Sequence, residues 1–496
     1  MVAQWAQMEV ASVNLGDQRL NNRLPILLSA LGDGPNLSIP AACGGHADTQ
    51  AAYRFFDNPK VTFEQILLPH HEQTLQRMSQ QEVVLLVQDS SEIELDRPNQ
   101  EIVGVGELDG SRRGVLLHEM HAFTVDGIPL GTLWAECINR TQGVSHESAK
   151  QKRKQRQQKP LEEKESRRWI TGLKHATGAA LALPKVQCVC IADSEADIYE
   201  WFAEPRNESE EPLTRDGRDV PQLHWLVRAC QDRALQIQTD GGKTELCQRH
   251  LQEQVLATPV LYEADFLIRE RDAKTGVERR SRRVAREARH AKVQVRAATV
   301  TLRPPWRFDR KLPPVTVNVV LVSEIKPPKG EPPVQWVLVT TLPVNTPDQV
   351  RKIVEYYCVR WNIEILFRTL KSGCRIEHRR FEHVDRILPA MALYLIVAWR
   401  TMFVCRMGRS CPDADCETIF EPGEWKAVWA AVHQKNPPKK KPRLREIVHL
   451  IARLGGYVER PSSEPGAQTV WIGLQRMHDL AVAWKTFGPE TEMKSC

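Results

Sequence analysis

Two short and mostly apolar runs constrain the fold of this 496-residue chain more than any other feature. They are VVLLV at 83–87 and VQCVCIA at 186–192, and each has the length and composition of a strand buried inside a sheet. Further strands are expected at 114–125 and 129–137, and a helix at 166–182. Three strands, a helix and another strand in this order predict an α/β core with mixed strand pairing.

The segments on either side of this core have a different pattern. Residues 1–75 carry apolar side chains at helical spacing, and the chain after His378 is again helical apart from the Pro/Lys linker at 436–445. Between about 230 and 330, strand-like runs alternate with proline-rich segments, which predicts a β-rich insertion. We therefore expect an N-terminal helical domain at 1–75 and a core in two parts, at 76–230 and 331–377. A β-rich insertion is expected at 231–330 and a C-terminal helical domain at 378–496.

The composition is that of an ordinary globular protein, with 42% hydrophobic and 26% charged residues. The longest apolar run, 387–399, has 13 residues and contains Pro389, so it is too short to span about 30 Å of hydrocarbon, and we expect no membrane span. The N-terminus lacks the basic start and apolar centre of a secretory signal. These features predict a cytoplasmic protein whose 12 cysteines remain free thiols.

Two aspartates follow the two buried runs. Asp89 is the second residue after the first run, in VVLLVQDSS, and Asp193 comes directly after the later one, in VQCVCIAD. The ends of strands in an α/β sheet are where functional side chains collect. A single aspartate at such a place is more often a cap or a turn residue, but the occurrence of two favours a site.

A third acid, Glu364, lies in the predicted helix YYCVRWNIEILFRTLKSG. At about 100° per residue, Tyr357, Arg360 and Lys371 share the face of Glu364. The apolar residues on nearly the opposite side are Val359, Ile363, Leu366 and Leu370. The apolar stripe can therefore be buried while the polar stripe faces a site, although a solvated face would show the same periodicity.

Three carboxylates that converge on one point require a cation. A pair of like charges 4 Å apart costs roughly 1 kcal/mol in water and about 4 kcal/mol at an effective dielectric constant of 20. Oxygen-only ligands favour a hard ion, Mg²⁺ or Mn²⁺, and two such ions can activate a water or a 3′-hydroxyl and stabilise the leaving oxygen of a phosphodiester. Arg360 and Lys371 could bind phosphates beside this site. The residues alone thus indicate a metal-dependent phosphodiester-cutting site.

The spacing Tyr357-x2-Arg360-x3-Glu364-x6-Lys371 matches the Y-(2)-R-(3)-E-(6)-K signature. On this motif the chain resembles the bacterial insertion-sequence transposases of family four, the hairpin-forming, cut-and-paste group. The resemblance implies an RNase H-like catalytic core. It also implies that Tyr357, Arg360 and Lys371 hold transposon-end phosphates. Asp89, Asp193 and Glu364 would be the catalytic residues and the ligands of Mg²⁺ or Mn²⁺, with two ions expected.

The resemblance implies further contacts with DNA. Trp336, in VQWVLVTT, resembles the tryptophan on which the family stacks a flipped base, although a core tryptophan would also suit the start of a strand. Arg228 and Arg233, in WLVRACQDRAL, resemble basic residues next to bound DNA. Arg19 and Arg54 lie in LGDQRLNNRL and AAYRFFDNP, which resemble the N-terminal DNA-recognition domain of the family, but a solvated helical face would look the same.

The resemblance implies the function of a DNA transposase that cleaves at terminal inverted repeats, forms hairpins and inserts the excised element. Its partners would be double-stranded transposon ends, target DNA and a second copy of the chain, because WIGLQRMHDLAVAW and EWKAVW resemble the helical dimerisation domain of the family. It would act in the bacterial cytoplasm on the nucleoid and contact no membrane. The basic stretches 278–292 and 439–445 either contact DNA or are solvated.

Two other functions fit the same residues. One is an RNase H-like nuclease that cuts without strand transfer, and the other is a non-catalytic DNA-binding inhibitor of transposition. A product assay that finds hydrolysis but neither hairpins nor joined ends would indicate the nuclease. The complete set of three acids argues against the inhibitor.

Overall fold

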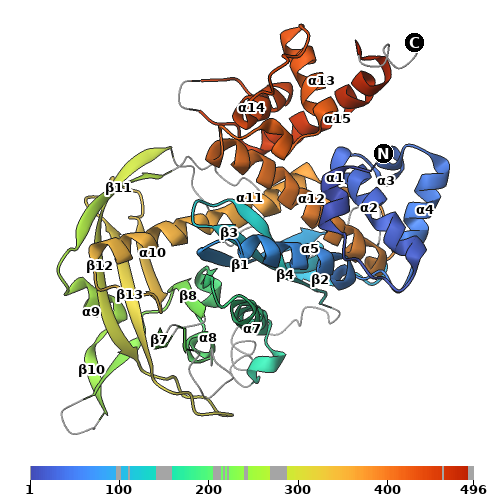
Figure 1. Ribbon diagram of the computed structural model, residues 1–496. Helices are drawn as coiled ribbons and strands as arrows, with labels where there is room; N and C mark the ends of the chain where they lie inside the picture. Colours follow the sequence, from blue (N-terminus) through green and yellow to red (C-terminus); the bar gives the residue numbers. More distant parts are fainter. Residues whose placement is uncertain are drawn as a thin grey trace. The chain divides into compact units, whose positions relative to one another are not determined.

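The chain divides into two compact units (Figure 1). The first unit comprises Met1–Ser148, Ala182–Val186 and Val359–Cys496, and the second comprises Ala149–Leu181 and Gln187–Cys358. The computed structural model describes residues 2–95, 102–109, 112–140, 159–204, 214–215, 218–219, 223–238, 244–268, 287–460 and 463–489.

The first unit begins with the helices that the apolar spacing predicts. They are α1 (Gln4–Glu9), α2 (Gln18–Asp33), α3 (Ile39–Cys43), α4 (His46–Phe56) and α5 (Phe63–Met78). Asp17, Ser38 and Thr62 accept backbone hydrogen bonds at the starts of α2, α3 and α5, so each of these helices begins at a side-chain cap. On α2, the side chains of Leu24 and Leu28 are fully buried.

A buried charge cluster ties α1 to the rest of the first unit. Glu9 accepts hydrogen bonds from the Arg77 guanidinium at 2.9 and 3.1 Å and from Nδ1 of His70 at 2.5 Å, and Nε2 of His70 accepts the backbone N–H of Thr132. Burial lowers the pKa of His70, so the ring stays neutral and can both donate and accept. Burial alone would raise the pKa of Glu9, but His70 and Arg77 outweigh it and the net pKa is lowered.

The first unit also contains an antiparallel meander. Its strands are β1 (Val83–Glu94), β2 (Glu107–Asp109), β3 (Arg112–Thr124) and β4 (Pro129–Ile138), and β3 pairs with each of the other three. The predicted strands are confirmed, but β1 is longer than its apolar run. Asp89 therefore lies inside β1, opposite Glu119, and the expectation that it follows the end of a strand is wrong. The ladder continues to Glu94 because Ile93 is again buried against β3.

The long helix α12 (Val384–Ser410) runs through the core of the first unit and packs against α2, α5 and β4. By length and composition alone it could cross a membrane, which the 13-residue apolar run did not anticipate. However, 83% of its most apolar window is buried inside the protein. This burial is what the central helix of a globular core shows.

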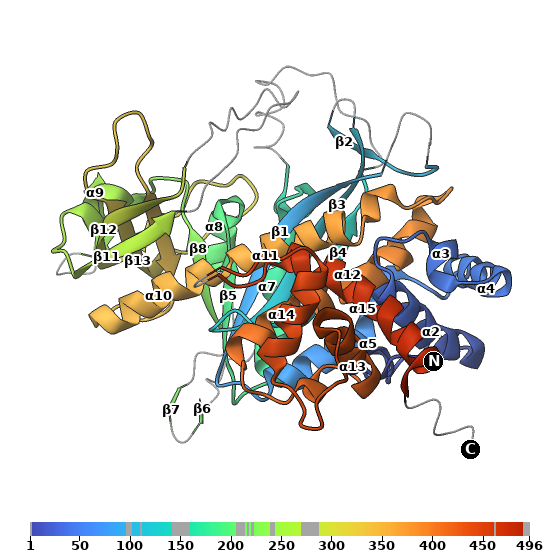
Figure 2. The same cartoon turned by 90° about the horizontal axis from the view of Figure 1, so that it is seen from above.

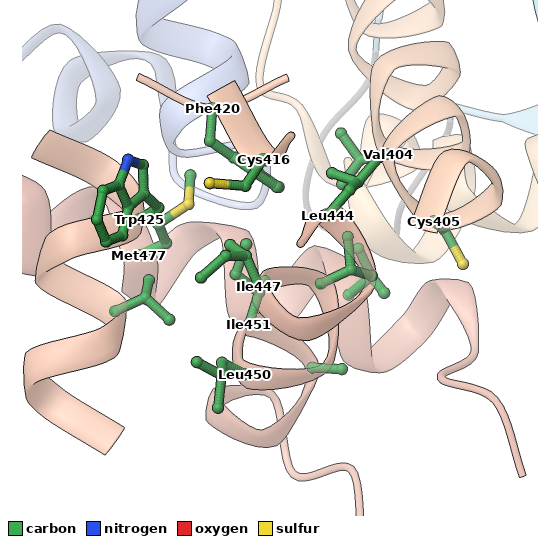
Figure 3. Close-up of a cluster of buried hydrophobic side chains, with 14 residues drawn as sticks. Val404, Cys405, Cys416, Phe420, Trp425, Leu444, Ile447, Leu450, Ile451 and Met477 are labelled. Carbon is green, nitrogen blue, oxygen red and sulfur yellow. The ribbon is translucent and has the colours of Figure 1, made fainter. Parts of the chain in front are cut away.

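Three further helices follow α12, of which two pack on α12 and the first packs on these two (Figure 1, Figure 2). They are α13 (Pro422–His433), α14 (Leu444–Leu454) and α15 (Ala467–Phe487). Figure 3 shows the apolar cluster that they share with α12, in which Trp425, Leu444 and Ile447 are buried. The helices α14 and α15 approach so closely that a Cβ atom on Gly473 would lie 1.9 Å from the carbonyl oxygen of Ile451.

The second unit is built on one mixed sheet. Its strand order is β10-β9-β12-β13-β14-β8-β5, with β11 paired to β12. The strands are β5 (Gln187–Ala192), β8 (Leu223–Arg228), β9 (Ala234–Gln238), β10 (Thr244–His250), β11 (Tyr262–Ile268), β12 (Arg289–Leu302), β13 (Val315–Glu324) and β14 (Gln335–Thr340). β5 and β8 are parallel, whereas the other pairs are antiparallel, so the predicted mixed pairing is confirmed.

The strands predicted as a β-rich insertion belong to this same sheet. Figure 2 shows β11, β12 and β13 side by side, and β13 continues the sheet through β14 to β8. The remaining elements are α7 (Arg167–Ala182), α8 (Tyr199–Ala203), α9 (Leu251–Leu256), α10 (Pro347–Val359) and the small strands β6 (Thr214–Arg215) and β7 (Arg218–Asp219). The segment therefore widens the core sheet of the second unit.

The close approach of α14 and α15 gives a test of packing. Gly473→Ala should lower the free energy of unfolding by about 1–3 kcal/mol, because the backbone of α14 leaves no room for the methyl group. Gly178→Ala is the matched control, since this exposed position in α7 has nothing within 4 Å of a Cβ atom. The control should be neutral or stabilising by about 0.4–1 kcal/mol. Thermal unfolding measures both, and equal effects would contradict the packing argument.

Candidate active site

The signature segment is not one continuous helix. It is divided between α10, which ends at Val359, and α11 (Trp361–Arg368), and then passes into a π-helical turn at Thr369–Gly373. Arg360 lies at the junction with helical dihedral angles, φ −49° and ψ −37°. The rotation of 100° per residue therefore does not hold within the turn that contains Lys371, because a π-turn has more residues per turn than an α-helix.

Arg360 joins two of the predicted catalytic acids within the first unit. Its Nη1 donates to Oδ2 of Asp89 at 3.0 Å, and its Nη2 donates to Oε1 of Glu364 at 3.1 Å. The side chain of Arg360 is 6% exposed, that of Asp89 is 16% exposed and that of Glu364 is 50% exposed. The guanidinium also lies over the Trp361 ring, with 4.5 Å between Cζ and the ring centroid. One buried cation thus neutralises two carboxylates from distant parts of the chain.

The donor chemistry of this pair suits a hard metal ion. Both acids offer only oxygen atoms, and both are already gathered around one positive charge. Within the described ranges, no group of three or more His, Cys, Asp or Glu residues is arranged to hold a metal ion. Asp89 and Glu364 would supply two oxygen ligands to such an ion.

Asp193 lies in the second unit, directly after β5, as its sequence context predicts. Its side chain accepts the backbone N–H of Glu195 at 2.8 Å and caps the 3-10 turn Ser194–Ala196. The residue is partly exposed. A carboxylate that caps a turn through one oxygen keeps acceptor capacity for another partner.

Arg233 has a structural partner that the sequence did not reveal. Its guanidinium donates to Asp197 at 3.1 Å and 2.5 Å, and the other oxygen of Asp197 accepts the backbone N–H groups of Cys230 and Gln231, each at 2.8 Å. The side chain of Asp197 is fully buried and that of Arg233 is 9% exposed. This pair holds the connection between β8 and β9, and the predicted DNA contact of Arg233 would require it to open.

The predicted base-stacking tryptophan belongs to an aromatic cluster. Trp336, at the start of β14, lies with its ring centroid 5.7 Å from those of Phe266 and Tyr357. Tyr357 is only 1% exposed, whereas Trp336 is partly exposed. The cluster holds the indole ring in place and leaves part of it exposed. The predicted stacking of a base on Trp336 stays a prediction.

The other predicted DNA-binding residues lie at or near the surface. Arg228 ends β8 and is partly exposed, and Arg54 is exposed on α4. The side chain of Arg19 is 91% exposed and pairs with Asp17 at 3.0 Å. Lys371 is 30% exposed, with its Nζ 3.8 Å from Glu377. Their contacts with DNA stay predictions.

The two basic stretches differ in what the structure describes. Residues 278–286 lie outside the described ranges. In 439–445, Lys441 pairs with Glu417 and Asp415, Arg443 pairs with Asp413 at 2.6 Å, and Arg445 pairs with Glu464 at 2.6 Å. Much of the positive charge of the second stretch is therefore balanced within the protein.

Three family models match successive parts of the chain. A transposase DNA-binding model matches residues 2–61, a transposase DDE domain matches residues 146–399, and a transposase Tn5 dimerisation domain matches residues 396–485. The DDE model covers about half of the chain. The chain belongs to the DDE transposase family. Asp193 and Glu364 lie within the DDE match, whereas Asp89 precedes it.

Membership of the DDE transposase family bears on the predicted activity, fold, partners and metal ions. The protein is a DNA transposase, an enzyme that cleaves and joins DNA, and it resembles the insertion-sequence transposases of family four as its signature indicated. The DDE domain implies an RNase H-like fold, which agrees with the mixed α/β architecture. The transposase carries DNA-binding and dimerisation regions, and its family uses divalent metal ions.

Arg233 and Arg228 differ in burial and contacts, so their replacement should have different effects on stability. Arg233→Ala should destabilise the transposase by about 3 kcal/mol or more, because it leaves the buried carboxylate of Asp197 without its charge partner. Arg228→Ala should change stability by less than about 0.5 kcal/mol, since this side chain is partly exposed. Urea unfolding measures both values. A harmless Arg233→Ala would show that the pair does not hold this connection.

Proposed function

We propose that the transposase excises and inserts a mobile element by cutting at terminal inverted repeats, closing the cut ends as hairpins, reopening them and joining them to target DNA. Asp89, Asp193 and Glu364 would be the catalytic acids. They would hold two Mg²⁺ or Mn²⁺ ions, which supply Lewis-acid activation of the attacking hydroxyl and neutralise charge on the phosphate. Cut-and-paste chemistry with hairpins is the activity that the family-four signature implies.

The observation that carries this proposal is the sharing of Arg360 by Asp89 and Glu364. Two acids held by one buried cation are close enough to act together and are kept from repelling each other. When metal ions take over this neutralisation, the guanidinium becomes available for a phosphate oxygen, which suits the role that the signature gives Arg360. Arg360 would thus keep the acids in place before the ions bind and bind DNA afterwards.

The remaining predicted residues would position the DNA. Trp336 offers an aromatic surface fixed by Phe266 and Tyr357, and a flipped base stacked on such a platform gains about 1–3 kcal/mol. Lys371 and Arg228 are accessible cations for phosphate oxygens. For the dimer, α15 exposes two apolar side chains, with Val482 53% and Phe487 85% exposed. These features support binding of two transposon ends by a homodimer.

The first test removes each catalytic acid. Asp89→Ala, Asp193→Ala and Glu364→Ala should each abolish strand cleavage while sparing binding to DNA, because a missing carboxylate removes a metal ligand but no contact of the N-terminal region. Cleavage and hairpin products are resolved on denaturing gels, with a duplex that carries the inverted repeats flanking the gene as substrate. Asp348→Ala, at an acid 86% exposed on α10, is the control and should cut normally.

Each outcome of this assay is informative. Retained cleavage in any of the three variants would remove that residue from the proposed catalytic set. Products of hydrolysis without hairpins or joined ends would show that the wild-type protein is a nuclease and would contradict the strand-transfer part of the proposal.

A second test uses the competition between Arg360 and metal ions for the same acids. Without DNA, Arg360→Ala should bind Mn²⁺ at least about tenfold more tightly than the wild type, because the cation that neutralises both carboxylates is gone. Titration followed by electron paramagnetic resonance measures the bound Mn²⁺. Lys352→Ala, at an exposed cation of α10, should leave the affinity unchanged. Equal affinity of wild type and Arg360→Ala would contradict the proposed competition.

A further inference from the structure

We propose that the loop joining β12 and β13, residues 303–314 (RPPWRFDRKLPP), is an additional DNA-binding site that accepts unstacked bases. The proposal rests on the action of the transposase on DNA, but it involves none of the residues assigned to the catalytic centre or to the transposon-end contacts. The two strands that carry the loop are paired along ten positions, so its base is part of the sheet of the second unit (Figure 1).

Two large aromatic side chains on this loop face solvent. Trp306 is 84% exposed and Phe308 is 53% exposed. Exposed single apolar residues are common, but an indole this accessible with a second aromatic two residues away is typical of a binding surface. Both rings offer flat faces on which a base can stack.

The loop is held in place by contacts at its ends and in its middle. Arg307 forms a two-point contact with Glu200, at 2.6 and 3.2 Å. The hydroxyl of Tyr199 donates to the carbonyl oxygen of Pro313 at 2.8 Å. Four of the loop's residues are prolines, which restrict its backbone. Because Arg307 lies between the two aromatic residues and is anchored, Trp306 is presented by a preorganised loop, and binding costs little conformational entropy.

The charges of the loop suit a phosphate backbone. It contains four basic residues and one acidic residue. Arg307 pairs with Glu200, and Arg310 pairs with Asp309 and with Glu162. The other two basic residues, Arg303 and Lys311, are exposed and form no ion pair with any residue that the structure describes. The order along the chain is therefore cation, aromatic, aromatic, cation.

This order fits a strand with unpaired bases better than a protein partner. A single strand binds when its bases stack on aromatic rings and its phosphates meet flanking cations. The core of a protein interface would need contiguous apolar surface. The exposed surface of the adjoining strands is instead polar, with hydrogen bonds between the side chains of Thr299 and Asn318 and between those of Thr301 and Thr316.

The test measures binding of a labelled oligo(dT) strand and of a blunt random-sequence duplex to the full-length transposase by fluorescence anisotropy, without metal ions. Trp306→Ala and Trp306→Leu should weaken oligo(dT) binding about tenfold or more, because a stacked base is lost. Trp306→Phe should stay within about twofold of wild type, since it keeps an aromatic face. Duplex binding should change less than oligo(dT) binding in all three variants.

The charge contribution is tested separately by its salt dependence. The double variant Arg303→Ala with Lys311→Ala should reduce the slope of log K against log[salt] by about 1.4, which is two phosphate contacts on a single strand. Lys329→Ala is the matched control, because it removes an exposed lysine from another proline-containing turn of the same unit and should leave the slope unchanged.

Three results would overturn the proposal. They are wild-type affinity of Trp306→Ala for oligo(dT), equal affinities of Trp306→Leu and Trp306→Phe, and an unchanged salt slope in the double variant. Equal affinities of the leucine and phenylalanine variants would indicate apolar burial, as in a protein partner. The assay needs neither metal nor cleavage, so its failure is distinguishable from failure of the catalytic acids in the cleavage assay.

Discussion

The pairing of Arg360 with Asp89 and Glu364 is the interaction on which the proposed chemistry depends. It joins the middle of β1 to the start of α11, which are more than 270 residues apart in the chain. Carboxylates brought together without a cation would repel each other and would raise their own pKa values or move apart. A buried guanidinium removes that penalty, and in the proposed mechanism metal ions of higher charge would replace it. The same contact holds the two acids in place, and the proposed metal ions would compete with Arg360 for them.

Other arginine–carboxylate pairs separate the basic residues that stabilise the fold from those that are accessible to DNA. Arg77 holds Glu9 with His70, and Arg233 holds Asp197, so these guanidinium groups stabilise the two units from within. Removing a partner from such a buried pair costs several kcal/mol, whereas an exposed cation costs almost nothing to replace. The accessible cations, Arg303 and Lys311 among them, are free of that structural duty and are the ones suited to phosphates.

Much of the fold could be predicted because the buried runs and their periodicity are local signals. The strands of the meander, the N-terminal helices and the helix before β5 all appear where their patterns place them. The prediction that Asp89 follows a strand was wrong, because pairing with β3 extends β1 beyond its apolar run. The π-turn that contains Lys371 was not predicted, since such a turn leaves no mark in the spacing of apolar residues. The burial of Arg233 was also hidden, because its partner Asp197 lies 36 residues earlier.

The sequence by itself determined the family, the mixed α/β character and the identity of the candidate acids, because strand composition, helical spacing and the Y-(2)-R-(3)-E-(6)-K motif are written in short segments. Only the tertiary structure decided that Arg360 bridges Asp89 and Glu364, that Arg233 is buried and that Trp306 is exposed. The physical reason is that charge pairing and burial depend on which distant segments pack together. The presence of an arginine or a tryptophan in the sequence does not show whether its side chain is buried in the core or exposed to solvent.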